Sequence, residues 1–312
     1  MTMQVLNPGL LTLVQDFGRY RMQKYGITNS GPMDEHAFLW ANKLLGNHFN
    51  ASQLEICMGG FAARFEQNTV IAVCGAQGKI TLNDQEINPW ETYAVLAGDE
   101  VRIDFFSTGL YSYLAVKGGF DVEPQLHSTA TVMRELLGGA NHDGKKLFVK
   151  ERFSYQESSH DFKSVIPSEY KPISNDEVCL RFVPNYSETG CSSEAISDFT
   201  QRSFTVSNEI NRMGYRLKGD AIFNDRQGII SQGISVGTIQ LPKDGQPIVL
   251  MKDRQTIGGY PQLGCVAYLD LAMLSQSKPG TQVRFQAADI VELEEDLKSY
   301  LDFFQITYAH RV

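Results

Sequence analysis

Short apolar segments separated by turn residues dominate the hydrophobic and polar pattern along most of this chain. After Leu54, Gly, Asn and Asp recur between these segments, which is typical of strands joined by tight turns. The pattern predicts strands in the first half at 62–65, 69–74, 79–82, 92–96, 100–106 and 111–116. Because these strands do not alternate with helices, the pattern favours a sandwich or barrel over a Rossmann-like parallel sheet.

The N-terminal segment combines a strand with a helix. Apolar and polar residues alternate over 5–14, which predicts a strand that leads into a loop at 15–19. From Met33 apolar residues recur at helical spacing, so we expect a helix near 33–45 that begins with Asp34 and Glu35. Carboxylates in a first turn interact favourably with the helix dipole, and Gly46 is typical of a helix end.

The second half is also strand-rich, after a polar stretch at 154–175 that predicts a long loop or linker. We expect an N-terminal β-rich domain at 1–175 and a C-terminal β-barrel domain at 176–312, with room for strands exchanged between the halves. Expected strands are 177–183, 203–206, 248–251, 265–269 and 282–286. A final amphipathic helix is predicted from residue 289, with an apolar stripe of Ile290, Leu293, Leu297, Leu301 and Phe304.

Composition narrows the class of protein. The 312 residues are 42% hydrophobic and 21% charged, which is ordinary for a globular chain. A net charge of -8 argues against a nucleic-acid partner, because phosphate binding needs clustered Lys and Arg. No apolar run is long enough to predict a membrane helix, and the N-terminal pattern leads us to expect no signal peptide. Five cysteines without a C-x-x-C pair indicate reduced thiols and a cytoplasmic protein.

Two kinds of functional site find little support in the sequence. The stretch Gly139–Lys146 reads G-x-x-x-x-G-K, but a second lysine replaces the hydroxyl residue that a phosphate-binding P-loop requires. Its context is also reversed, since 131–137 has a helical pattern and 147–149 a strand pattern. The six histidines do not lie at metal-ligand spacing, so no metal site is predicted.

Three tracts combine glycine with charged and amide side chains, namely 15–19, 211–216 and 253–261. Glycine lets the backbone bend sharply or approach a ligand closely, and arginine offers a planar fork suited to a carboxylate or phosphate. The alternative is that their Asp and Arg side chains form internal ion pairs that hold loop corners. The residues alone leave both interpretations open.

The chain resembles the allophanate hydrolase subunit 2 family, also called the biotin-dependent carboxyltransferase family. The resemblance rests on long stretches in order: V-Q-D-F-G-R, S-G-P-M-D, A-N-K-L-L-G-N, L-E-I-C-M-G-G, Y-L-A-V-K-G-G, N-R-M-G-Y-R-L-K-G, G-T-I-Q-L-P-K-D-G-Q-P-I-V-L and D-R-Q-T-I-G-G-Y-P. It implies a mainly β fold with a few helices, built from cyclophilin-like β-barrel units in tandem. One departure is the loop 127–132, where the family commonly has an arginine and an acid.

The resemblance implies an enzyme component that functions within a complex. The first expectation is the C subunit of a 5-oxoprolinase, which acts with a Kip inhibitor-like B subunit and with an A subunit in the ATP-dependent opening of 5-oxo-L-proline to L-glutamate. ATP would be used by the complex rather than clearly bound by this chain. The alternatives are a carboxyltransferase component of a biotin-dependent urea carboxylase system and a non-catalytic Kip antagonist-like regulator.

We expect the site to draw on all three tracts. Catalytic roles are expected for Asp253, Arg254 and Tyr260, with Asp253 as the base or orienting group. Arginines would hold anionic groups, and amide, hydroxyl and backbone groups would position a small amide substrate. The expected substrate-binding residues are Gln15, Asp16, Arg19, Arg212, Tyr215, Gln255, Thr256, Gly258 and Gly259.

Overall fold

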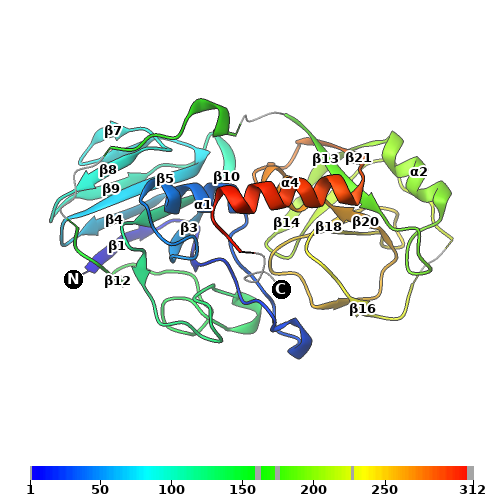
Figure 1. Ribbon diagram of the computed structural model, residues 1–312, viewed down its shortest axis with the longest axis horizontal. Helices are drawn as coiled ribbons and strands as arrows, with labels where there is room; N and C mark the ends of the chain where they lie inside the picture. The colour runs from blue at the N-terminus through cyan, green and yellow to red at the C-terminus, as the bar shows by residue number, and fades with distance from the viewer. Residues whose placement is uncertain (1, 159–162, 173–175, 226–227, 308–312) are drawn as a thin grey trace. The chain divides into compact units, whose positions relative to one another are not determined.

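The computed structural model describes residues 2–158, 163–172, 176–225 and 228–307, and the chain divides into two compact units (Figure 1). Unit 1 comprises Met1–Arg19 and Ser30–Ser174, whereas unit 2 comprises Tyr20–Asn29 and Asn175–Val312. The segment 20–29 therefore belongs to the second unit although unit 1 residues flank it on both sides. Part of the expected linker at 154–175 lies outside the described residues.

Unit 1 is built from two antiparallel sheets that enclose one hydrophobic core. The seven-stranded sheet has the order β11-β12-β1-β4-β9-β6-β7 and the five-stranded sheet the order β2-β3-β10-β5-β8. Apolar residues of both sheets meet in the core because alternate side chains of each strand point inward. The strands are β1 (Thr2–Pro8), β2 (Leu11–Gln15), β3 (Gln53–Cys57), β4 (Phe61–Phe65), β5 (Thr69–Gln77), β6 (Ile80–Leu82), β7 (Gln85–Ile87), β8 (Thr92–Val95), β9 (Glu100–Ile103), β10 (Thr108–Val116), β11 (Phe120–Asp121) and β12 (Arg152–Tyr155).

Helix α1 (Glu35–Leu44) lies where the sequence predicts a helix and packs on β5 and β10. The Asp34 carboxylate caps it by accepting a hydrogen bond from the Ala37 amide at 3.0 Å. At the other end Gly46 has φ 61°, and the Gly46 and Asn47 amides donate to the Lys43 and Asn42 carbonyls. This pair of bonds is a Schellman motif, which glycine favours because it adopts a left-handed conformation readily.

The segment between β11 and β12 corrects two sequence predictions. Only Met133–Glu135 forms a helical turn, a 3-10 helix, in place of the longer helical segment that the pattern at 131–137 predicts. Residues 147–149 are not a strand; the Leu147 amide instead bonds the Thr12 carbonyl. Neighbouring strands and turns hold this segment through isolated hydrogen bonds, so its local apolar pattern did not reveal its conformation.

Unit 2 is a closed barrel with the strand order β13-β20-β17-β18-β15-β14-β21, completed by the parallel pairing of β21 with β13. A small separate ribbon pairs β16 with β19. The strands are β13 (Glu177–Pro184), β14 (Ser203–Asn211), β15 (Gly214–Lys218), β16 (Gln232–Gly233), β17 (Thr238–Gln240), β18 (Ile248–Leu250), β19 (Ile257–Gly258), β20 (Gln262–Val266) and β21 (Gln282–Ala287). The strand expected at 265–269 is β20, which ends at Val266 before a 3-10 turn at Tyr268–Asp270.

Three helices belong to unit 2: α2 (Ser193–Gln201), α3 (Leu271–Ser275) and α4 (Ile290–Phe303). Helix α2 was not predicted from the sequence, although the Ser192 hydroxyl caps it by accepting from the Ala195 amide at 3.2 Å. Helix α4 is the predicted C-terminal helix, but Ile290 at the start of its apolar stripe is 54% exposed and Leu301 only 2%. Only the end of the stripe is therefore buried.

The architecture confirms the predicted fold class, which is mainly β with a few helices and includes a β-barrel. In the part of the chain that the structure describes, no helix is long and apolar enough to cross a membrane.

Candidate functional site

Arg212 and Asp253 form a buried ion pair in unit 2. Arg212 Nε and Nη2 donate to the two Asp253 carboxylate oxygens at 2.8 and 2.9 Å, and both residues are 6% exposed. The Asp253 amide also donates to the Arg212 carbonyl at 2.7 Å. Two parallel charge-assisted bonds fix the carboxylate, and an Asp so held is better suited to anchoring the loop than to moving freely as a base.

The turn between β14 and β15 presents Arg212 to this carboxylate. Asn211 pairs with Gly214 across the turn, and the Asn211 side-chain oxygen accepts from the Met213 amide at 2.7 Å. The Met251 amide donates to the Met213 carbonyl at 2.9 Å, which joins the turn to the end of β18. The second and third tracts of the sequence are thus brought together by backbone pairing.

Arg254 is buried without an equivalent partner. It is 7% exposed, and in the described part of the chain its guanidinium makes one hydrogen bond, from Nε to the Ile234 carbonyl at 3.2 Å. No described carboxylate lies at ion-pair distance, and burial lowers the pKa of this guanidinium. A buried charge without a paired counter-charge is costly, which makes the terminal nitrogens of Arg254 a candidate site for binding an anion.

Two further polar residues lie near the end of β20 and the turn that follows it. Lys252 Nζ donates to the Tyr268 hydroxyl at 2.9 Å and lies 4.7 Å from the centre of the same ring. The Cys265 thiol donates to the Val236 carbonyl at 3.4 Å. Burial raises the pKa of Cys265 to about 11, although the positive charge of Arg254 acts in the opposite direction. Cys265 is therefore a neutral thiol at physiological pH.

The rest of the third tract forms a glycine-rich ribbon. Ile257 and Gly258 form β19, which pairs with β16, and the Ile234 amide donates to the Thr256 carbonyl at 3.1 Å. A Cβ atom at Gly258 would lie 2.5 Å from Gln240 Nε2, so a side chain here would require the Gln240 amide to shift. At this position the backbone closely approaches a glutamine of the barrel.

The other residues of this tract differ in exposure. Gln255 and Tyr260 are exposed, Thr256 and Gly259 are half-buried, and all four remain accessible to a ligand. Tyr215 of the second tract is fully buried, and its hydroxyl donates to the Ser275 carbonyl at 2.8 Å. Tyr215 therefore stabilises the core of the barrel and is not accessible to a ligand.

The first tract lies in unit 1 and holds the segment that follows β11. Asp16 accepts from the Ser128 hydroxyl at 2.5 Å and from the Thr129 amide at 2.7 Å. Arg19 donates to the Gln125 and Ser128 carbonyls at 3.0 and 3.2 Å. Gln15 Nε2 donates to the Thr131 carbonyl at 3.2 Å. These side chains are buried, which favours the structural interpretation that the sequence left open for this tract.

The segment that they hold includes the divergent loop 127–132. Gln125 and Ser128 exchange backbone hydrogen bonds around a two-residue turn, in which Leu126 and His127 have φ 53° and 65°. Such values at two successive residues define a type I′ turn, which costs energy for residues other than glycine or asparagine. Asp16 and Arg19 supply the bonds that keep the turn in place.

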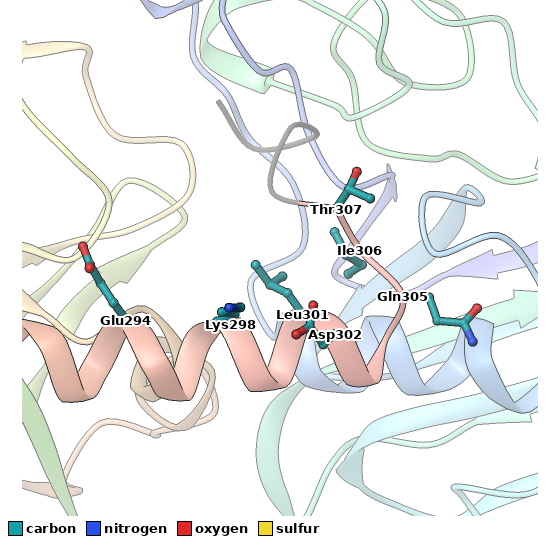
Figure 2. A pocket seen from close by; sticks show the side chains of 7 residues that line it. All are labelled: Glu294, Lys298, Leu301, Asp302, Gln305, Ile306 and Thr307. Atoms are coloured by element: carbon teal, nitrogen blue, oxygen red, sulfur yellow. The ribbon is translucent and has the colours of Figure 1, made fainter.

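Three other kinds of candidate site lie outside the three tracts: the glycine-rich stretch near Gly139, metal-binding clusters and surface hollows. In the glycine-rich stretch near Gly139, Lys145 pairs with Asp143 at 2.9 Å and Lys146 donates to the Leu10 carbonyl at 3.1 Å, so both lysines have partners. Among the described residues, no group of three or more His, Cys, Asp or Glu could hold a metal. A hollow of about 750 Å³ lies beside the end of α4 and contains no residue of the three tracts (Figure 2); it is lined by Glu294, Lys298, Leu301, Asp302, Gln305, Ile306 and Thr307.

Residues 25–287 match the family described as carboxyltransferase domain, subdomain A and B. The chain belongs to this family. It is 31% identical over 293 residues to the 5-oxoprolinase C subunit of Haemophilus influenzae, and the match covers 93% of each chain. It is 33% identical over 303 residues to the 5-oxoprolinase C subunit of Escherichia coli K12, covering 96% of this chain and 94% of that one. The family resemblance inferred from the sequence motifs is confirmed.

Solved structures agree with this assignment. The urea amidolyase of K. lactis superimposes with a TM-score of 0.88 and 26% identity over 98% of this chain. This family member spans only 20% of the length of that urea amidolyase. The urea carboxylase of Kluyveromyces lactis gives the same TM-score at 27% identity, over 97% of this chain and 29% of that one.

Proposed function

We propose that this family member is the C subunit of a cytoplasmic 5-oxoprolinase complex, which opens 5-oxo-L-proline to L-glutamate with the use of ATP. The support is the full-length similarity to two bacterial proteins of that name, at 31% and 33% identity. Such a protein works within an assembly, and we propose the A and B subunits of 5-oxoprolinase as its partners. Five free cysteines support a reducing compartment.

The observation that carries the proposal is the uncompensated guanidinium of Arg254. 5-Oxo-L-proline is a small lactam with one carboxylate, and a planar guanidinium binds a carboxylate through two parallel hydrogen bonds. Binding would neutralise a charge that the fold leaves buried. The substrate carboxylate would thereby be fixed, and the lactam would be directed away from Arg254.

The neighbouring residues would then take different roles. Asp253 acts as a positioning residue, because its two contacts with Arg212 hold the backbone from which Arg254 projects. Tyr260 and Gln255 are exposed on the same tract and can offer hydrogen bonds to the lactam. The buried bonds of Asp16 and Arg19 give them a supporting role in unit 1.

We assign no cofactor of the complex to a site in this chain. ATP would supply the energy for opening the lactam, but the lysines of the glycine-rich stretch in this chain are bonded to Asp143 and Leu10. These groups do not fit a nucleotide cradle. ATP therefore has no role in what we propose for this chain. Biotin would be used only if the function were carboxyl transfer.

A second candidate function is transfer of a carboxyl group in a biotin-dependent system. The observation that favours it is the likeness to the K. lactis urea amidolyase over 98% of this chain. The two candidates differ in the small substrate, since urea is neutral and 5-oxo-L-proline is an anion. A requirement for a substrate carboxylate therefore separates them, and Arg254 favours the anion.

The experiment uses the full chain assembled with its partner proteins and measures ADP release that depends on 5-oxo-L-proline. Arg254→Gln should raise KM about ten- to hundredfold, because one charge-assisted contact contributes about 1.5–3 kcal/mol. The carboxamide of 5-oxoproline, which lacks the charge, should bind wild type and variant equally. An exposed cation of the barrel serves as the matched control, in the variant Arg284→Gln.

Three outcomes would overturn the proposal. Full turnover by an assembly that lacks this chain would show that it has no part in the reaction. An Arg254→Gln variant with unchanged KM would remove the anion site. A chain that binds a Kip inhibitor-like protein tightly, while no assembly turns over 5-oxo-L-proline, would support the regulatory alternative.

A further inference from the structure

The segment Tyr20–Asn29 belongs to unit 2 although both of its sequence neighbours belong to unit 1. Its side chains reach the residues that surround Arg254. Gln23 Nε2 donates to the Ile234 carbonyl at 3.1 Å, and the Thr28 hydroxyl lies 3.4 Å from the Arg254 carbonyl. These two bonds attach the segment to the backbone around the Arg254 side chain.

Two donors converge on one carbonyl at this point. The Ile234 oxygen accepts from Gln23 Nε2 at 3.1 Å and from Arg254 Nε at 3.2 Å. A carbonyl oxygen has two lone pairs, so both bonds can form together. The Ile234 amide is held in turn by the Thr256 carbonyl, and the Ile234 side chain is buried.

We propose that the segment 20–29 positions the Arg254 anion site, and that Gln23 is the positioning residue, acting through the Ile234 carbonyl. The proposal rests on the function proposed above for Arg254. The Nε bond sets the direction of the guanidinium plane, because it is the one hydrogen bond that the described part of the chain gives this group. Gln23 fixes the carbonyl at the other end of that bond.

Preorganisation is the physical reason that this bond affects ligand binding. A bidentate contact requires the guanidinium plane to coincide with the plane of the carboxylate, and a side chain that is already fixed loses less freedom on binding. Loss of the Gln23 bond would leave Arg254 charged and buried but less well oriented. Binding of the carboxylate should weaken while the later chemical step is unchanged.

The first test replaces Gln23 by methionine, which keeps the length of the side chain but cannot donate a hydrogen bond. In the assembled complex, Gln23→Met should raise KM for 5-oxo-L-proline about three- to tenfold with kcat unchanged, as expected for one neutral hydrogen bond. Binding of the carboxamide should be unaffected. Gln85→Met, at an exposed glutamine of β7, is the matched control and should match wild type.

A second measurement needs no variant at Gln23. Hydrogen exchange of the full chain is followed by mass spectrometry in acetate, a minimal carboxylate, and in chloride at the same ionic strength. Acetate should slow exchange across residues 20–29 in wild type and have no such effect in Arg254→Gln. A segment that merely packs on the barrel would exchange at the same rate in both salts.

The outcomes separate this inference from the proposed function. If Arg254→Gln raises KM but Gln23→Met leaves it unchanged, the positioning role is wrong and the anion site stands. The same conclusion follows if Gln23→Met weakens the carboxamide as much as the acid. If acetate protects residues 20–29 but 5-oxo-L-proline is not turned over, the coupling stands and the substrate assignment fails.

Discussion

The Asp253 carboxylate accepts two hydrogen bonds from Arg212, at 2.8 and 2.9 Å, whereas the next residue in the chain, Arg254, donates from Nε to a backbone carbonyl. Among the described residues Asp253 makes its ion pair with Arg212, and it acts on Arg254 only through a longer-range attraction. Two arginines with similar sequence surroundings thus have different roles. Arg212 is paired with a carboxylate, whereas Arg254 makes one hydrogen bond in the described part of the chain, to a backbone carbonyl.

Asp253→Asn should destabilise the protein by about 3–5 kcal/mol, because Arg212 would remain buried without a counter-charge. Urea unfolding followed by circular dichroism measures this loss. The double variant Arg212→Met with Asp253→Leu removes both charges and should lie closer to wild type than the single variant. A single variant as stable as wild type would show that the pair does not hold the loop.

Asp16→Asn should loosen the segment that follows β11. The carboxylate accepts from the Ser128 hydroxyl and the Thr129 amide, and replacing it with a neutral amide should cost about 1.5–3 kcal/mol. Hydrogen exchange should accelerate at 125–131 before the rest of unit 1. The control variant Asp104→Asn, at an exposed aspartate, should change neither the unfolding free energy nor the exchange rate at 125–131. Equal changes in the two variants would contradict the role given to Asp16.

Gly258→Ala should destabilise the ribbon by about 1–3 kcal/mol, because the new methyl group would lie 2.5 Å from Gln240 Nε2. Adding Gln240→Ser should recover part of this loss, which a double-mutant cycle measures. Gly233→Ala on the paired strand is the matched control, since a Cβ atom there meets nothing within 4 Å. Equal losses for the two glycine variants would mean that backbone freedom, and not space, explains Gly258.

The raised pKa of Cys265, about 11, predicts a dependence of stability on pH. The unfolded thiol titrates near its ordinary value of about 8.5. The folded state holds the proton more tightly, so this contribution to stability is complete below that pH and is lost as the pH rises toward 11. As the pH rises from neutral to alkaline, wild type should therefore lose more unfolding free energy than Cys265→Ser does.

The raised pKa of Cys265 also predicts that Cys265 reacts more slowly than the exposed Cys179. At pH 8, alkylation should modify the exposed Cys179 well before Cys265, because the thiolate is the reactive species. The rate at Cys265 should increase as the pH approaches 11. Rapid modification of Cys265 at neutral pH, measured by mass spectrometry of the digested protein, would contradict the burial that raises its pKa.

Features that depend on near neighbours in the chain could be predicted from the sequence. Helix α1 could be predicted because Asp34 caps its own helix and Gly46 adopts the left-handed conformation that ends it. Most strands could be predicted because alternation of apolar residues over a few positions is a local signal. The family could be identified because its motifs are continuous stretches of sequence.

Only the three-dimensional structure shows which polar side chains already have hydrogen-bond partners. Arg19 finds its partners more than 100 residues away, and Arg212 finds its partner 41 residues away. The contribution of Gln23 to the site, through Ile234, spans 211 residues and left no sign in the local pattern. Long-range pairing fixes these contacts, and it distinguishes an arginine paired with a carboxylate from Arg254, which makes one hydrogen bond in the described part of the chain.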